Sequence, residues 1–115
     1  MRLGRKSFLS LVLMLGIVYS NVASAEEYTG WGKIISVENG WQGEGVAILH
    51  SIASIKGCAA DSNDFAIDKN HPSYKELVAI ALAAFTSQSD VQLVVDKGVC
   101  IFGARTKIIS IQLKK

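Results

Sequence analysis

The sequence is poor in the residues from which catalytic and metal sites are built. It has only two histidines, His50 and His71, and only two cysteines, Cys58 and Cys100. These four residues lack the close spacing of a zinc motif, and no Gly-x-Ser-x-Gly or other nucleophile setting occurs. We therefore predict that the protein is not an enzyme and that it binds no metal and no cofactor.

Long apolar runs are also missing. The longest, Phe8–Tyr19, is shorter than the about 20 residues that a membrane-spanning helix needs. It follows Arg2, Arg5 and Lys6 and precedes Ala23-Ser24-Ala25, which together give the three-part pattern of a signal peptide. We expect cleavage after residue 25, export to the periplasm or beyond it, and no membrane span afterwards. The alternative is an uncleaved anchor.

Residues 26–115 have almost no net charge. The signal peptide contains three of the 12 basic residues and none of the 10 acidic residues, so 9 basic and 10 acidic side chains remain, a net charge of −1. Nucleic-acid binding needs a basic surface, so we predict no nucleic-acid partner. The remaining 90 residues are enough for one small domain. We therefore expect a signal peptide over 1–25 and a single domain over 26–115.

Export to an oxidising compartment favours a disulfide between Cys58 and Cys100. The bond would close a loop of roughly 40 residues and would stabilise the fold by about 4 kcal/mol in the chain-entropy model. The alternative, a reactive or metal-bound pair of cysteines, lacks the further ligands that a metal would require.

One segment, Pro72–Phe85, has a clear helical pattern. Pro72 suits the first helical position, and Asn70 or His71 would cap the helix, Asn being the better capping residue. The helix is apolar nearly all round, which is typical of a helix buried on more than one side. The predicted buried face consists of Tyr74, Leu77, Val78, Ala81 and Phe85.

The rest of the chain after residue 30 alternates between strand patterns and turns. Ile35 and Val37 are expected to share one face of their strand, as are Ile109, Ile111 and Leu113. Residues 26–30 read as a lead-in, and 54–63 as a loop around Cys58. The predicted strand segments are Trp31–Val37, Gly45–Ile52, Phe65–Ile67, Val91–Asp96 and Ile108–Leu113. A turn is predicted at Lys97-Gly98, and Val99–Phe102 after it carries Cys100.

This order, with the helix between the third and fourth strands, predicts a mainly β protein with one helix. We expect an OB-like five-stranded Greek-key barrel in which the helix plugs one end. The alternative is an α+β sheet with one covering helix. A doubly wound parallel fold would need more helices than one.

Part of the chain resembles a known family. Phe65–Asp68, His71–Leu77, Ala81–Phe85 and Val91–Val95 resemble small secreted bacterial proteins of the subtilase cytotoxin B subunit family. The resemblance implies an OB-like fold, a homo-oligomeric ring of five subunits with the helices at the central pore, and sialoglycan binding in the toxin member. This chain is shorter and has no match to the family's N-terminal glycan-binding segment, so no sugar-contacting residue is carried over.

Candidate ligand-binding residues gather around the first predicted hairpin. Sugars are bound by flat aromatic rings, which contact the C–H face of the pyranose, together with amides and carboxylates that bind hydroxyls. The candidates are Tyr28, Glu38, Asn39, Trp41, Gln42 and Glu44. The alternative is structural, with Trp31 closing the barrel and Trp41 covering its end.

Ala79 and Ala83, one turn apart on the helix, would permit close approach of another helix and are the candidate oligomer interface. The alternative is burial under the chain's own 54–63 loop. The leading functional hypothesis is a secreted non-catalytic binding module that resembles a toxin B subunit and recognises cell-surface glycan as a homo-oligomer. The alternative is a periplasmic or envelope module that binds another secreted protein and has no glycan site.

Overall fold

The computed structural model describes residues 26–115 and shows a mainly β protein with one α-helix. The predicted signal peptide, 1–25, lies outside the described residues. Within them, no helix is long and apolar enough to cross a membrane. In chain order the elements are β1 (Glu26–Tyr28), β2 (Ile34–Asn39), β3 (Gly45–His50), β4 (Asp64–Asp68), α2 (Tyr74–Ser87), β5 (Asp90–Ile101), the short 3₁₀ helix η1 (Phe102–Ala104) and β6 (Arg105–Lys114).

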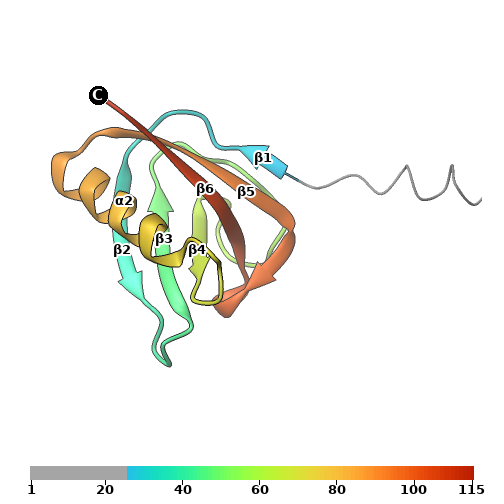
Figure 1. Cartoon of the computed structure of the whole chain (residues 1–115). Coiled ribbons are helices and arrows are strands. Elements are labelled where there is room, and N and C mark those ends of the chain that lie inside the picture. The colour runs from blue at the N-terminus through green and yellow to red at the C-terminus, as the bar shows by residue number, and fades with distance from the viewer. Residues whose placement is uncertain (1–25) are drawn as a thin grey trace, which may run out of the picture.

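The strands form one six-stranded sheet in the order β1-β5-β6-β4-β3-β2 (Figure 1). Every neighbouring pair is antiparallel except β4 and β6, which run parallel. The mainly β class with one helix is therefore confirmed, and the helix follows β4 and precedes β5 as predicted. The closed five-stranded barrel is not confirmed, because the sheet has six strands and is not closed. The additional strand is β1, which was predicted to be a lead-in and pairs with β5.

Two β-bulges change which side chains face the core. Ile34 pairs with His50 while Ser36 pairs with Leu49, so Ile35 is the extra residue of β2. Such an extra residue shifts the alternation of side chains by one position. Ile34 is fully buried and Ile35 is exposed, so the prediction that Ile35 and Val37 share a face is wrong.

The second bulge lies in β6. Val94 pairs with Ser110 and Val95 with Ile108, which leaves Ile109 as the extra residue. Ile108 and Ile111 are consequently both buried in the core. The predicted face of Ile109, Ile111 and Leu113 is therefore wrong for Ile109, whereas Ile111 and Leu113 lie opposite Leu93 and Val91 and share a face.

β5 is one long strand, although the predicted strand ended at Asp96 and was followed by a turn. Asp96 pairs with Lys107 and Cys100 with Thr106, so residues 97–99 bulge out without a partner and pairing then resumes. The Gly98 N–H donates to Asp96 Oδ1 at 3.0 Å within this bulge. The prediction of a turn at Lys97-Gly98 is therefore wrong: the chain bulges at 97–99 but continues in the same direction along β6.

Helix α2 lies across one side of the sheet and contacts β2, β4 and β6 (Figure 1). Leu77, Ala81 and Ala84 are buried against the core. Leu82 and Phe85 remain 47% and 38% exposed, so the predicted burial of Phe85 and of more than one side of the helix is wrong within this chain. The main core residues under the helix come from all the longer strands: Ile34, Val46, Ile48, Phe65, Ile67, Val91, Leu93, Val95 and Ile108.

The helix begins two residues later than predicted. Ser73 is the N-cap residue but makes no side-chain capping bond. Tyr74 N–H donates to His71 O at 3.0 Å, and Ser73 N–H donates to His71 Nδ1 at 2.9 Å. Pro72 therefore occupies a turn that leads into the helix and not its first position, and neither Asn70 nor His71 caps it.

His50 joins three segments of the fold in the interior. Its side chain is fully buried. Nε2 lies 3.0 Å from Val91 O, and Nδ1 accepts the N–H of Ala53 at 3.1 Å. A neutral ring with its proton on Nε2 satisfies both bonds. The ring thereby fastens the end of β3 to β5 and to the segment that follows β3.

A polar junction lies beside this histidine, where the segment before β2 meets β5 through a bridge between Gly32 and Val91. Lys33 Nζ is 2.8 Å from Asp90 Oδ1. The hydrogen bond from Lys33 is the main cause that lowers the pKa of the Asp90 carboxyl; desolvation opposes it, and the charges of Lys33 and Lys114 add to the lowering. Lys114 Nζ also lies 4.3 Å from the centre of the Trp31 ring, a cation–π contact.

Candidate functional site

The turn between β2 and β3 is held by hydrogen bonds within it. Gly40 N–H donates to Gly45 O at 2.8 Å, and Gly43 N–H donates to Gly40 O at 3.2 Å. The side-chain Oε1 of Glu44 accepts the N–H of Gln42 at 2.7 Å. These bonds give the turn a fixed shape and place Trp41 at its tip.

Gly45 is required where the turn re-enters the sheet. Its φ is +152°, and a Cβ there would collide with the carbonyl oxygen of Ile67. Only glycine adopts such a φ readily. The Glu44 O also accepts the N–H of Lys69 at 2.9 Å, so the turn is anchored to the segment that follows β4.

A cavity of about 370 Å³ opens between this turn and the connection from β5 to β6. Five of the six predicted ligand residues line it. Because they lie close together in sequence, at the end of β2 and in the turn that follows it, the fold brings them together without any long-range pairing. The lining consists of Glu38, Asn39, Gly40, Trp41, Gln42, Glu44, Ala47, Phe102, Gly103 and Arg105.

Two aromatic rings border the cavity. Trp41 is 93% exposed, so it does not cover the core, and its ring is available to a ligand. Phe102 contributes the other ring from η1 and lies close to Gly45, where an added Cβ would come within 3.0 Å of Phe102 Cε1. The cavity thus has one free aromatic face and one packed against the turn.

Arg105 contributes the only basic side chain of the lining, and its charge is already paired. Its Nε donates to Asp64 Oδ1 at 2.9 Å, and both side chains are about one-fifth exposed. The guanidinium carbon lies 5.8 Å from the centre of the Phe102 ring. The ion pair therefore ties β6 to β4 and holds Phe102 beside the cavity.

Glu38 enters the site from β2. It pairs directly with Ala47 of β3, and directly opposed residues share one face of a sheet. Val46 and Ile48, which flank Ala47, belong to the core on the opposite face. Glu38 is exposed, and among residues 26–115 neither Glu38 nor Glu44 forms an ion pair.

Tyr28 lies elsewhere. It belongs to β1, where it pairs with Val94 of β5, and it does not line the cavity. Its side chain is 61% exposed. Among the six predicted ligand residues, Tyr28 is the one that the fold separates from the others, because β1 lies at the opposite end of the sheet order from β2.

Ala79 and Ala83 are both exposed on α2. The alternative in which the chain's own 54–63 loop buries them is therefore wrong. Neither residue lines the cavity at the turn. The helix face and the turn cavity are thus separate surfaces of the described structure.

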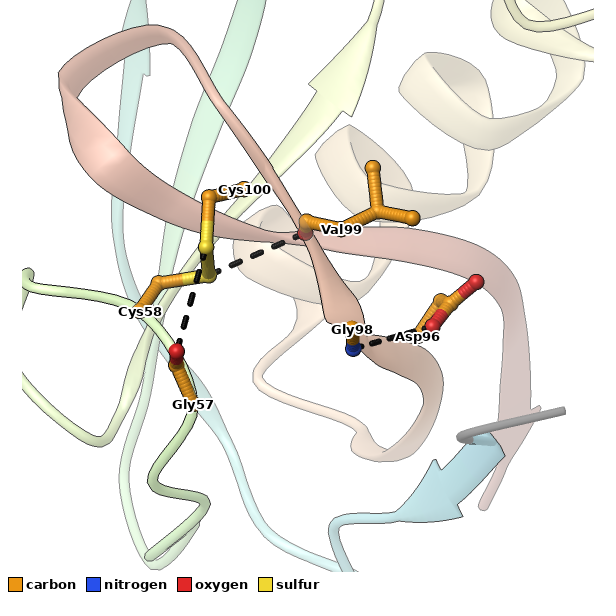
Figure 2. The surroundings of a disulfide bond; sticks show 6 residues. All are labelled: Gly57, Cys58, Asp96, Gly98, Val99 and Cys100. Atoms are coloured by element: carbon orange, nitrogen blue, oxygen red, sulfur yellow. Dashed lines mark hydrogen bonds between the residues drawn. A yellow bond between two sulfur atoms is a disulfide. The ribbon is translucent and has the colours of Figure 1, made fainter.

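The structure joins Cys58 and Cys100 in a disulfide, with 5.6 Å between their Cα atoms. Figure 2 shows how the bond attaches the 54–63 loop to β5 at Cys100, directly after the bulge. Cys58 Sγ lies 3.7 Å from Val99 O; because disulfide sulfurs carry no hydrogen, this is a contact and not a hydrogen bond. Cys100 is two residues before Phe102, so the disulfide also restrains one wall of the cavity.

Neither histidine lines the cavity at the β2–β3 turn. His50 is buried with both ring nitrogens bonded to the backbone. His71 lines a different cavity of about 470 Å³ beside the start of α2, with Lys69, Pro72, Tyr74, Lys75 and Glu76. Within the part of the chain that is described, no three His, Cys, Asp or Glu residues lie together as metal ligands would.

Sequence reasoning missed Phe102, Arg105 and Ala47 as lining residues. Phe102 and Arg105 are about 60 residues from the turn in the chain, and only the parallel pairing of β4 with β6 brings them near. The sequence carried one signal, the glycine at 103, which marks the tight β5–β6 connection with its φ of +67°.

Comparison of the chain with protein-family models, curated proteins and solved structures found no match.

Proposed function

We propose that this protein is a non-catalytic binding module, that its ligand site is the cavity at the β2–β3 turn, and that the ligand is a glycan. One observation carries the proposal: five of six residues chosen for sugar-binding chemistry line one cavity, with the Trp41 ring 93% exposed beside it. An exposed indole on a fixed turn, next to amides and carboxylates, offers a stacking face and hydroxyl partners together.

The strand pairing supports the finer proposal of an OB-like fold. Residues 26–39 behave as one interrupted strand, whose first part pairs with β5 and whose second part pairs with β3. The bridge between Gly32 and Val91 adds a contact between the two ends of the sheet. OB barrels are partly open, which is compatible with a sheet that is not closed.

If the fold is OB-like, the cavity lies where such proteins bind ligands. OB folds bind oligosaccharides and oligonucleotides with the loops that join strands one to two and four to five. The β2–β3 turn and η1 are those two loops in this alignment of elements, and both line the cavity. The two carboxylates in the lining, Glu38 and Glu44, form no ion pair among the described residues. They favour a sugar over a nucleic acid, whose phosphates they would repel.

The same pair of carboxylates raises the question of sugar hydrolysis, since glycosidases use two. The general acid of such enzymes lies in an apolar setting that keeps it protonated. Glu38 is exposed and one oxygen of Glu44 is bound by a backbone N–H. This arrangement supports binding without cleavage, and chromatography of the sugar after incubation with the protein would reveal any hydrolysis.

The experiment uses the two tryptophans. Replacing Trp31 by Phe leaves Trp41 as the sole tryptophan reporter. We expect glycans that bind to shift Trp41 emission to shorter wavelength, because stacking removes the ring from water. The Trp41→Ala variant should lose binding by calorimetry, while Trp31→Phe should retain it. Emission that stays unchanged across a broad glycan array would refute the glycan site.

The exposed side of α2 supports a second proposal, association of the protein with further copies of itself. Ala79, Leu82, Ala83 and Phe85 are all exposed within one chain, and small residues permit close helix approach. The resemblance to toxin B subunits implies a pentamer. Light scattering at micromolar concentration should give a mass above that of one chain, and Ala83→Glu should reduce it. A monomeric mass would refute self-association and favour a protein-interaction module that binds another secreted protein.

We propose that the protein acts outside the cytoplasm, in the periplasm or after secretion. The disulfide supports this location, because such bonds persist in oxidising compartments. Mass spectrometry of the protein from its native host should find Glu26 at the N-terminus. Detection of residues 1–25 on the exported protein would refute cleavage after Ala25 and favour the uncleaved anchor.

A further inference from the structure

The charges around the turn cavity are unbalanced. Its two carboxylates, Glu38 and Glu44, form no ion pair among residues 26–115. Its one basic group, Arg105, is already neutralised by Asp64 at 2.9 Å. A ligand that enters the cavity therefore meets two negative groups without ion-pair partners among the described residues, and no uncommitted positive group in the lining.

The free aromatic face points to the same ligand chemistry. A cation is attracted to the face of an aromatic ring, and tryptophan is the strongest partner. Phe102 already has the Arg105 guanidinium 5.8 Å from its ring centre. Trp41, at 93% exposure, has no cation over its ring among residues 26–115. An indole face beside two carboxylates is a suitable setting for a protonated amine.

We infer that the glycan bound in this cavity carries a free amine, as in a 2-amino-2-deoxy sugar that is not acetylated. The inference rests on the proposed glycan function and specifies its ligand. The ammonium group would lie between the Trp41 ring and the carboxylates of Glu38 and Glu44, while the ring hydroxyls meet Asn39 and Gln42. An acidic sugar, such as the sialic acid that the family resemblance implies, would place its carboxylate against two like charges.

Three oligosaccharides of similar size test the inference: a glucosamine oligomer, its N-acetylated counterpart and a sialylated oligosaccharide. Binding is measured by Trp41 emission in the Trp31→Phe protein. We expect the free amine to bind about tenfold more tightly than the acetylated sugar, since hydrogen bonds between charged groups are roughly twice as strong as neutral ones. The preference should shrink as salt is added, because salt screens exposed charges.

Matched charge variants locate the effect. Glu38→Gln should bring the affinities for the amine and the acetylated sugar to within about threefold, since it removes one of the two charges but keeps the shape. Glu76→Gln is the control, because it removes the same charge from α2, outside the turn cavity. We expect Glu76→Gln to keep the full preference. A preference lost equally in both variants would mean that overall charge and not the cavity selects the ligand, which overturns the inference.

The outcomes separate this inference from the proposed function. If the acetylated or sialylated sugar binds as tightly as the amine, the glycan site stands and the amine inference is overturned. If none of the sugars binds but a lysine-rich peptide does, both are overturned in favour of a protein partner. If nothing binds, both are overturned.

Discussion

Removal of the Cys58–Cys100 disulfide should destabilise the protein more than any other single change away from the core. The bond spans a sequence separation of 42 residues, for which the chain-entropy model gives about 4 kcal/mol. A domain of this size has a free energy of unfolding of roughly 5–13 kcal/mol. The reduced protein should therefore keep only part of its stability.

The structure allows this loss to be assigned to the cross-link. Cys100 is exposed and Cys58 is half-buried, so Cys58→Ala/Cys100→Ala creates no cavity in the core. The main change is the larger freedom of the unfolded chain. We expect the melting temperature to fall by about 15–30 °C, at roughly 4–8 °C per kcal/mol for a small domain.

Urea unfolding of the double alanine variant, followed by circular dichroism, measures the loss. The oxidised wild type is the reference, and the wild type in reductant is the matched control, which should coincide with the variant. Equal urea midpoints for the oxidised wild type and the variant would refute the reasoning. A variant that is less stable than the reduced wild type would show that the alanines themselves cause part of the loss.

The remaining predictions concern three sites in the sheet. Gly45→Ala should cost at least about 1–3 kcal/mol, because alanine is strained at that φ, and urea unfolding measures it; a neutral effect would mean that the turn adjusts easily. His50→Leu should cost about 1–3 kcal/mol because it leaves the buried N–H of Ala53 without an acceptor; hydrogen exchange at Ala53 should quicken, and unchanged exchange would contradict this role. The hydrogen bond from Lys33 lowers the pKa of the Asp90 carboxyl in the folded protein. The ionised carboxylate therefore stabilises the fold at pH values above its pKa in the unfolded chain, about 3.9. This stabilisation is lost as the pH falls through the lower pKa of the folded protein. Asp90→Asn should therefore weaken the acid dependence of the urea midpoint, and an identical dependence in the variant would show that the pair contributes nothing.

The helix, the disulfide and the first half of β5 were predictable because each depends on local pattern or on few choices. Val91, Leu93 and Val95 alternate without interruption, and all three are buried. Cys58 had only one possible partner, Cys100. The fold class follows from one helix among strands, and it needs no knowledge of register.

The faces of β2 and β6 were not predictable, because each contains a bulge. At Ile35 and Ile109 the local sequence is Ile-Ile, so either isoleucine could face the core. Which one does so depends on the partner strand, where Ile34 is opposite His50 and Ile108 is opposite Val95. A period-two pattern contains no information about such pairings.

The wall of the candidate site that the β2–β3 turn forms was predictable from the sequence, whereas the opposite wall was not. The turn residues are contiguous, so their gathering needed no tertiary information. The opposite wall, Phe102 and Arg105, depends on the ion pair between Arg105 and Asp64 and on the parallel pairing of their strands. Tyr28 was grouped with the turn residues because it is close to them in sequence. Its strand, β1, pairs with β5, so it lies apart from Trp41 and does not line the cavity.

Glu44 and Glu38 contribute to the cavity in different ways, and this decides which of them reports on ligand binding. Glu44 builds the turn, because its Oε1 accepts the Gln42 N–H at 2.7 Å and lies so close to Gly40 that a Cβ there would meet it. Replacing it by Gln would remove charge and alter the turn at once. Glu38 lies on a regular strand opposite Ala47 and makes no side-chain bond among the described residues. Its substitution therefore changes charge alone, so a loss of ligand preference in Glu38→Gln can be assigned to electrostatics, whereas the same loss in Glu44→Gln cannot.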